Sequence, residues 1–543
     1  MAKLTVNQLN RRELLASFLA APVALNGCAR REPLPPLPPG EIVGASAAVG
    51  HRLRQSAALE LADDQWQRAR VVIIGGGIAG LAAARTLLRA GVDDFVLLEL
   101  EDAIGGTSRS GTGDVVSYPW GAHYVPAPTR ENLPLVELFD ELDVFEGVDE
   151  RGDPVVAEPF RCRFPQERLF YKGRWYDGLY LWAGASADDL RQWQAFQREI
   201  DAWVSWRDGR GRRAFAIPMA SGSDDPEVTR LDQITMAEWM DERHFSSDRL
   251  RWLVDYSCRD DYGLRLSETS AWAGLFYFAS RRDVPGGDSR PFITWPEGNG
   301  RIVSHLYRQV KSQCRLGWAV LDVNPGANGI EVIASRYTDS TLAGWRADKV
   351  IFAAPQFLTR FMIRPYCETV PAHVSEFQYS AWAVANVTLT TPPQSRDAPL
   401  AWDNVLYESP SLGYVSATHQ CGMDYGTSVL TYYYPLCAAD PVTERQRLLD
   451  TDRDAWADVV LTDLEVAHPE LRQTALRLDV MRWGHAMIRP TPGFVWGGAR
   501  QAASRPFRGI HFAHADLSGI ALFEEAFFRG MTAAEQVVAE LQV

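Results

Sequence analysis

The order of hydrophobic and polar residues near the start of the chain predicts a strand, a helix and a second strand. Residues 71–74 are a continuous β-branched run, typical of a strand buried on both faces of a parallel sheet. Residues 81–91 place apolar side chains three and four positions apart and end in glycine, which indicates an amphipathic helix. Residues 95–99 are again apolar. This succession is the beginning of a βαβ unit.

Further along, the pattern alternates between helical and extended segments. Helices are predicted over 188–206 and 234–256, separated by a loop at 221–225. Strands are predicted on both sides of the turn cluster 324–329 and at three other places, namely 350–355, 378–391 and 428–435. This interleaving indicates two lobes, each built from discontinuous segments of the chain.

The first thirty residues are expected to be a targeting signal rather than part of the fold, and a spacer is expected to follow them. A twin-arginine pair, Arg11 and Arg12, precedes a mostly apolar run at 14–25 that is too short to span a bilayer but fits an export signal. Cys28 ends a lipobox-like sequence. The alternative is an amphipathic N-terminal helix with a chance cysteine. Five prolines within 31–40 predict a stiff, extended spacer.

Length, charge and cysteine usage narrow the class of protein. At 543 residues the chain is long enough for several domains, and its net charge of −14 disfavours non-specific nucleic-acid binding. The aromatic residues include 18 Trp, enough to line a large apolar pocket as well as a core. No cysteine or histidine spacing indicates a metal site. The six cysteines after Cys28 are interpreted as ordinary thiols, although an exported protein could form disulfides.

A glycine-rich motif follows the first strand and indicates dinucleotide binding. Gly75 permits a tight turn, Gly77 lets the backbone approach a pyrophosphate, and Gly80 allows close packing of helix on strand. An acid 22 residues after Gly77 is positioned to accept hydrogen bonds from a ribose. The predicted cofactor-binding residues of this motif are Gly75, Gly77, Ile78, Ala79, Gly80 and Glu99.

Segments outside this motif resemble the FAD-dependent amine oxidase superfamily, the flavin-containing amine oxidoreductases, which are also related to phytoene desaturase-type flavoproteins. The segments that carry the resemblance are 105–109, 120–125, 294–300, 348–355 and 509–534. The resemblance implies an α/β fold: a Rossmann-type FAD-binding domain with a doubly wound parallel sheet and an interleaved α+β substrate domain. It implies FAD as the cofactor. No cysteine occurs in 484–500, so the FAD is expected to be non-covalent.

The resemblance also divides the chain and adds cofactor-binding residues. The expected parts are an export signal (1–28), a linker and extension (29–68), the FAD-binding domain (69–149, 291–360 and 481–543) and the substrate domain (150–290 and 361–480). The additional cofactor-binding residues that it implies are Gly106, Thr107, Arg109, Gly121, Ala122, His123, Asp516 and Ala521. Thr107 stands where the family usually has arginine, and Arg109 is expected to reach the phosphate instead.

The catalytic residues are harder to assign because the family's flavin-proximal lysine is missing. The equivalent stretch, 379–389, contains no lysine, and Asn386 is the candidate to hold a water there. His123 is the preferred ionisable group, because histidine exchanges protons near neutral pH. Trp483 is a candidate wall of the flavin site, with core packing as the alternative. His485 is a candidate base, with a structural role as the alternative.

The expected function is that of an exported FAD-dependent oxidoreductase that removes a hydride from an organic substrate. An amine is the first candidate, polyamines included, and the acidic stretch 260–262 could attract it unless it is a solvated loop. The alternatives are a desaturase or isomerase of an apolar polyene, and a flavin-bearing binding or electron-transfer protein without turnover. The expected location is the periplasm or the outer side of the inner membrane, with membrane contact only through a lipid anchor. Electrons would pass to oxygen, a membrane quinone or a redox partner.

Overall fold

The structure, a computed structural model, describes residues 35–44, 50, 61–395, 397–423 and 425–541. The predicted export signal, Cys28 and part of the predicted linker lie outside these residues. Within the described ranges, no helix is both long and apolar enough to cross a membrane. The six cysteines in the described part are all free thiols, as expected.

The first sheet has seven strands and is built around the predicted βαβ unit. Its order is β12-β3-β2-β15-β14-β13, and β21 also pairs with β15. Every pairing among β12, β3, β2, β15 and β21 is parallel. Strand β14 pairs antiparallel with both β15 and β13. The strand bounds are β2 Trp66–Ile74, β3 Phe95–Glu99, β12 Cys314–Leu316, β13 Trp318–Gly326, β14 Gly329–Arg336, β15 Leu342–Phe352 and β21 Ile510–Phe512. The doubly wound parallel sheet is therefore confirmed.

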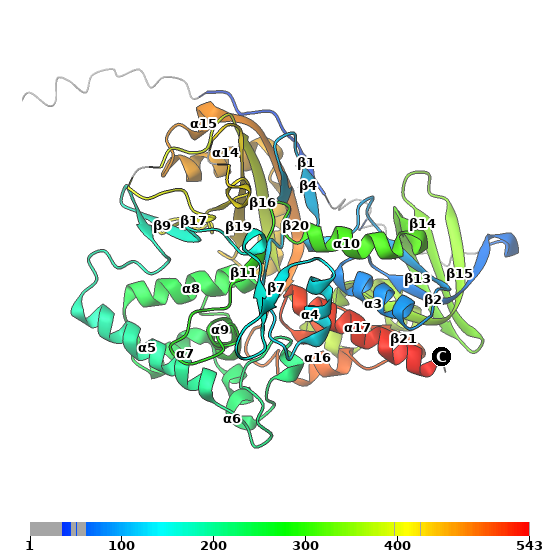
Figure 1. Ribbon diagram of the computed structural model, residues 1–543. Helices are drawn as coiled ribbons and strands as arrows, with labels where there is room; N and C mark the ends of the chain where they lie inside the picture. The colour runs from blue at the N-terminus through cyan, green and yellow to red at the C-terminus, as the bar shows by residue number, and fades with distance from the viewer. Residues whose placement is uncertain (1–34, 45–49, 51–60, 396, 424, 542–543) are drawn as a thin grey trace, which may run out of the picture. The chain divides into compact units, whose positions relative to one another are not determined.

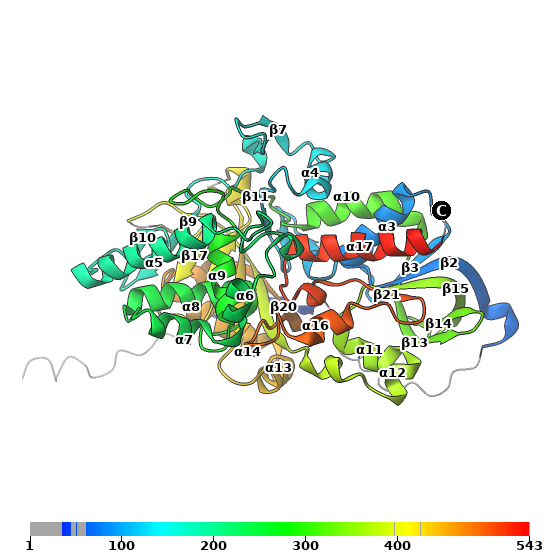
Figure 2. The same ribbon diagram turned by 90° about the horizontal axis from the view of Figure 1, so that it is seen from below.

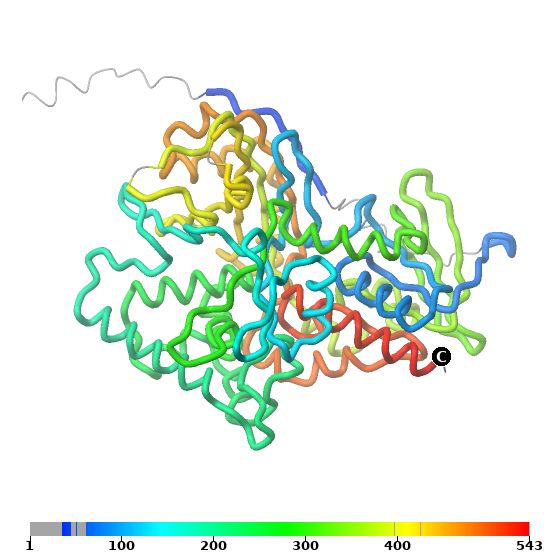
Figure 3. The backbone as a smooth tube through the Cα atoms, in the orientation of Figure 1, coloured from blue at the N-terminus to red at the C-terminus, as the bar shows by residue number. Residues whose placement is uncertain are grey.

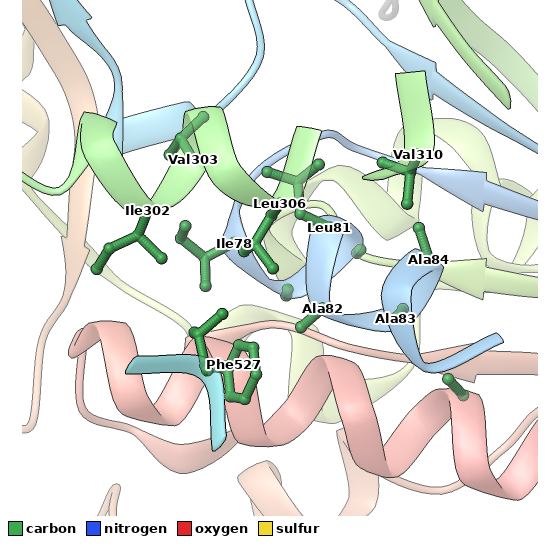
Figure 4. Packing of buried hydrophobic residues seen from close by; sticks show 14 of the residues in the cluster. Ile78, Leu81, Ala82, Ala83, Ala84, Ile302, Val303, Leu306, Val310 and Phe527 are labelled. Atoms are coloured by element: carbon green, nitrogen blue, oxygen red, sulfur yellow. The ribbon is translucent and has the colours of Figure 1, made fainter. Parts of the chain in front are cut away.

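Helices cover both faces of this sheet because its central strands are apolar on both sides. Val71 and Ile73 pack toward one hydrophobic cluster, and Val72 and Ile74 toward another. Figure 2 shows α3 (Ile78–Arg89), α10 (Gly300–Val310) and α17 (Phe523–Glu540) on one side, and α11 (Thr359–Met362) and α12 (Arg364–Glu368) on the other. The small residues of α3 allow α10 and α17 to pack closely around it, as Figure 4 shows. The C-terminal helix is thereby joined to the first helix of the domain.

The second sheet has eight strands and forms the centre of the substrate domain (Figure 1). Its order is β1-β20-β16-β19-β18-β17-β9-β10. It is mixed: β16 runs antiparallel to both β19 and β20, whereas β9 and β17 are parallel. The bounds are β1 Ile42–Val43, β9 Glu167–Tyr171, β10 Arg174–Asp177, β16 Tyr379–Leu389, β17 Asp403–Leu406, β18 Tyr414–Ser416, β19 Ser428–Leu436 and β20 Ala475–Ile488.

Helices from two stretches of the chain complete the substrate domain. The bounds are α5 Ala187–Ser205, α6 Pro226–Thr229, α7 Met236–Glu242, α8 Asp248–Tyr262, α9 Ala271–Ala279, α13 Pro441–Asp450, α14 Arg453–Glu465 and α15 Leu471–Thr474. The single helix predicted over 234–256 is wrong, because α7 and α8 are separate. His244 has a left-handed φ of 58°, and the Ser247 side chain caps α8.

Shorter elements connect the two sheets. They are α4 Leu133–Asp140, α16 Gly498–Ala503, β4 Ser110–Thr112, β5 Ser117–Pro119, β6 Tyr124–Pro126, β7 Phe145–Val148, β8 Pro154–Val156 and β11 Phe292–Thr294. Strand β6 pairs with β11, which brings the segment after β5 next to the second FAD-binding stretch.

The end of the proline-rich segment has a defined place that the sequence did not indicate. Strand β1 pairs in parallel with β20, and Figure 3 shows the two running side by side. The Pro39 carbonyl accepts from Leu478 N at 2.9 Å, and Glu41 N donates to the Asp479 carboxylate at 2.9 Å. This part of the predicted linker is thus an edge strand of the substrate-domain sheet.

Candidate active site

The glycine motif forms the turn between β2 and α3 that the sequence predicts. Gly75 adopts a left-handed φ of 102°. A side chain at Gly80 would overlap the Gly75 carbonyl oxygen, whereas nothing lies within 4 Å of the position that a Cβ of Gly77 would take. Open space is therefore left at the N-terminus of α3, where free N–H groups favour phosphate. Ile78 and Ala79 are buried in the first turn and hold the helix in place.

Glu99 shapes this loop from the end of β3. Its carboxylate accepts from Gly76 N at 2.6 Å and from Glu101 N at 2.8 Å. Burial raises the pKa of Glu99, against the lowering effect of these two hydrogen bonds. Each carboxylate oxygen keeps a further lone pair, and the contact of Glu99 with a ribose hydroxyl stays a prediction.

A glycine-lined surface continues from this loop toward the substrate domain. Gly105 N donates to the Gly76 carbonyl at 2.9 Å, so the 105–109 segment lies beside the phosphate loop. Ala122 N then donates to the Thr107 carbonyl at 2.9 Å, and a side chain at Gly121 would overlap that same carbonyl. Gly106 and Thr107 are exposed. The predicted residues of three separate motifs thus form one elongated surface.

The residues on this surface fit a flavin dinucleotide. The Nε atom of Arg109 is buried and has no hydrogen-bond partner among the described residues, although a guanidinium normally uses its donors. Arg109 is the predicted substitute for the family arginine that Thr107 replaces. A phosphate group of FAD beside Arg109 would satisfy this donor.

Asp516 follows β21 and lies in a dense hydrogen-bond network. Its carboxylate accepts from Gln356 N at 2.9 Å and from the Tyr379 hydroxyl, and it lies 2.9 Å from His514 Nδ1. Despite the opposing effect of burial, His514 and these donors lower the pKa of Asp516, which keeps it ionised. Ala521 packs against the core beside it. The contact of both residues with FAD stays a prediction.

His123 stands among aromatic rings at the end of this surface. Its Nδ1 lies 3.2 Å from the Gly121 carbonyl and must donate, which leaves Nε2 with a free lone pair. Burial lowers the pKa of His123 to about 4, so the ring is neutral at physiological pH. The ring stacks on Tyr433 at 4.8 Å and lies 5.3 Å from Trp402. The aromatic group consists of His123, Tyr124, Phe292, Trp402 and Tyr433.

The other predicted catalytic residues are distributed around this segment. Trp483 Nε1 donates to the Trp120 carbonyl at 2.6 Å. Asn386 is buried on β16. His485 stacks on Phe357 at 4.0 Å, on the side of Asp516. Their chemical roles stay predictions.

Three carboxyl groups lie beside the aromatic group and were only partly predicted. Glu167 and Asp403 start neighbouring strands and are register partners, and Asp260 lies on α8. Burial, reinforced by a neighbouring acid in each case, raises the pKa of Glu167 and of Asp260 to about 7 and that of Asp403 well above its ordinary value. In the described part of the chain, none of the three forms an ion pair with a basic side chain, and all three are only partly buried.

The acidic stretch 260–262 is helical rather than a solvated loop. Asp261 is 4% exposed and binds Arg281 through both oxygens, at 2.8 and 2.7 Å. Asp261 keeps the pKa of Arg281 well above its usual range in spite of burial. Sequence reasoning singled out Asp260 but missed Glu167 and Asp403, because only the pairing of β9 with β17 brings them together. Among the described residues, no group of acids, cysteines and histidines fits a metal ion.

Comparison with known proteins agrees with this geometry. The profile of the flavin containing amine oxidoreductase family matches residues 78–538. The chain therefore belongs to this family, and it is a FAD-dependent oxidoreductase.

Relatives share parts of the chain. A tryptophan 2-monooxygenase of Pantoea agglomerans pv. gypsophilae is 31% identical over 159 residues, which cover 25% of this chain and 28% of that protein. Amine oxidase [flavin-containing] B of Sus scrofa is 23% identical over 61% of this chain and 62% of its own length. Putrescine oxidase bound to putrescine has the same fold, with a TM-score of 0.64 and 16% identity over 87% of this chain and all of that chain.

Proposed function

We propose that this protein oxidises a small amine whose ammonium group is bound by Glu167, Asp260 and Asp403. Three carboxyl groups without a basic partner, next to an aromatic group, match the requirements of a cation, because a bound positive charge favours their ionised form and the rings offer π-faces. FAD, when bound, supplies the acceptor for the hydride. The side chains of this chain bind the ammonium, orient the carbon that loses the hydride and exclude water.

The arrangement of charge favours an amine over the alternatives. An apolar polyene would leave the three carboxyl groups without a partner at the substrate. An amino acid would also need a cation for its own carboxylate; Arg281 uses Nη2 for both oxygens of Asp261, so an amino acid stays in the substrate panel as the competing class. Three carboxyl groups exceed what one ammonium group needs, so a substrate with two or more amino groups, a polyamine, is the preferred subclass.

The same proposal includes export and an electron acceptor outside the cytoplasm. The twin-arginine pair, the apolar run and Cys28 support twin-arginine export, followed by release into the periplasm or lipid anchoring on the outer side of the inner membrane. No nicotinamide pool is available there, so oxygen, a membrane quinone or a redox protein would take the electrons from non-covalent FAD. Fractionation of cells that express the Arg11→Lys/Arg12→Lys and Cys28→Ala variants tests this route. Unchanged location in both would contradict it.

The substrate class is tested by anaerobic titration of the FAD-loaded protein. The panel contains a monoamine, a diamine, a triamine, an amino acid and an apolar polyene, and bleaching of the flavin absorbance is the readout. We expect bleaching by amines, most readily by the diamine and triamine. Bleaching by the polyene alone would assign the desaturase alternative, and no bleaching by any compound would assign the non-catalytic one.

Charge variants connect the titration to the three carboxyl groups. Glu167→Gln and Asp403→Asn should each raise the KM for the amine about tenfold or more, because a hydrogen bond to a charged group contributes about 1.5–3 kcal/mol. Glu376→Gln is the control, since Glu376 is exposed. Equal KM values in all three variants would contradict the proposed binding site.

A further inference from the structure

Three consecutive carbonyl groups at the cofactor end of the aromatic group are each held by a different side chain. Pro119 is the last residue of β5, and Trp120 and Gly121 begin the turn that leads to β6. Asn386 Nδ2 donates to the Pro119 carbonyl at 3.1 Å. The Trp120 carbonyl accepts the indole N–H of Trp483 described above, and the Gly121 carbonyl accepts from the Tyr433 hydroxyl at 2.9 Å. We call Asn386, Tyr433 and Trp483 the carbonyl clamp.

The clamp residues come from adjacent strands of the substrate-domain sheet. Asn386 is on β16, Tyr433 on β19 and Trp483 on β20, and β16 pairs with both of the others. Asn386 is held in orientation, because the Thr431 hydroxyl donates to its Oδ1 at 2.7 Å and leaves Nδ2 directed at Pro119. A rigid sheet therefore presents three donors at fixed spacing.

The next carbonyl groups are fixed from the FAD-binding side. The Ala122 carbonyl accepts from Asn299 N at 3.1 Å, and the His123 carbonyl accepts from the Thr294 hydroxyl at 2.7 Å. The segment 119–123 is thus hydrogen-bonded to β11 and the start of α10 on one side and to the substrate-domain sheet on the other. Its Gly121 and Ala122 also contact the Thr107 carbonyl, which belongs to the cofactor surface.

We infer that the carbonyl clamp positions the turn 119–121 and thereby fixes how FAD is seated against the substrate domain. Asn386 and Trp483 then act through the backbone as positioning residues, and the same holds for the Tyr433 hydroxyl. The inference depends on FAD binding, which the family shows, and is independent of the substrate proposed above.

The experiment removes one donor at a time from the FAD-loaded protein. Tyr433→Phe and Trp483→Phe keep an aromatic ring but lose the hydrogen bond. The controls are Tyr432→Phe and Trp382→Phe. Tyr432 lies on the same strand as Tyr433, and its variant loses a hydrogen bond to Asp463. The indole N–H of Trp382 has no partner in the described structure. Readouts are the rate of FAD release, followed by flavin fluorescence, and the circular dichroism of the bound flavin in the visible range.

We expect each clamp variant to release FAD about fivefold faster, the effect of one neutral hydrogen bond, and to change the flavin dichroism. The controls should stay within about twofold of the parent protein. Equal release from clamp and control variants, or unchanged dichroism in both clamp variants, would overturn the inference.

A variant of Asn386 separates positioning from general destabilisation. In Asn386→Asp an ionised carboxylate cannot donate to the Pro119 carbonyl, whereas a protonated one can. FAD release from this variant should therefore slow as the pH is lowered, while release from Tyr433→Phe should not acquire this dependence. A flat pH profile in Asn386→Asp would count against the clamp.

Discussion

The ion pair between Arg281 and Asp261 allows a quantitative test of how charge is arranged in the substrate domain. Both side chains are 4% exposed, and they form two short hydrogen bonds. Replacing Arg281 with Met keeps much of the volume but leaves the Asp261 carboxylate buried without its partner. Such a broken pair typically costs about 3–5 kcal/mol of unfolding free energy.

Protonation of Asp261 limits this cost and makes it depend on pH. Its ordinary pKa is 3.8, which applies in the unfolded chain. Holding it protonated in the folded variant costs about 1.4 kcal/mol for each pH unit above that value, or about 4 kcal/mol at pH 7 and about 2 kcal/mol at pH 5. In the variant the folded pKa is raised, so stability is retained at pH values below 3.8 and lost as the pH rises. Burial already raises the pKa of Asp261 in the parent protein, so part of this dependence is common to both proteins, and the penalty should shrink by at most about 3 kcal/mol between pH 7 and pH 5.

Urea denaturation of the FAD-loaded protein at the two pH values measures this penalty. The control is Arg191→Met, whose exposed pair with Asp188 should contribute about 1 kcal/mol or less. Removing both charges in Arg281→Met/Asp261→Leu should restore most of the stability. A single-variant penalty that is the same at pH 5 and pH 7, or below about 1 kcal/mol at both, would refute the reasoning.

Three further predictions concern substrate charge, helix packing and the acid after β21. A quaternary ammonium inhibitor has a charge that does not depend on pH. It should bind more tightly as the pH rises from 6 to 8, because Glu167 and Asp260 ionise with pKa values of about 7. Constant inhibition across this range would contradict their role. Gly530→Ala should lower stability by about 1–3 kcal/mol, because its Cβ would overlap a carbonyl oxygen of α3, whereas Gly498→Ala, with open space around it, should leave the melting temperature nearly unchanged. Asp516→Ala should accelerate FAD release, because Gln356 N and the Tyr379 hydroxyl would lose the carboxylate oxygen that they share; release at the parental rate would show that the network is not required for FAD.

The FAD-binding half of the protein could be predicted because its signals are local. The β-branched run before Gly75, the glycine spacing and the apolar face of the following helix all lie within about thirty residues. Gly75 is needed for its left-handed φ and Gly80 for its close approach to the Gly75 carbonyl, and both reasons are local. The C-terminal contribution is also visible, because Gly530 permits α17 to approach α3.

The substrate side could not be predicted in the same way, because distant strands create it. Glu167 and Asp403 are far apart in sequence and become neighbours only through the pairing of β9 with β17. The break between α7 and α8 depends on one left-handed residue and a serine cap within a helical pattern. The contact of Asn386 with Pro119 could not be predicted for a similar reason, since the two residues are far apart in sequence.

The raised pKa values of Glu167 and Asp260 bear on which group accepts a proton from the substrate, a question that the missing lysine leaves open. An alkylammonium substrate with a pKa near that of lysine, about 10.4, must lose a proton before its nitrogen lone pair can assist hydride loss. Transfer to a carboxylate of pKa 4.5 would cost about 8 kcal/mol, but transfer to Glu167 or Asp260, with pKa values of about 7, costs about 5 kcal/mol. His123, with a pKa of about 4 for its protonated form, is a poorer acceptor than either. On the proposed function, the burial that raises these two pKa values therefore serves both binding and proton acceptance. The carboxyl groups, rather than His123 or His485, then become the first residues to test as bases.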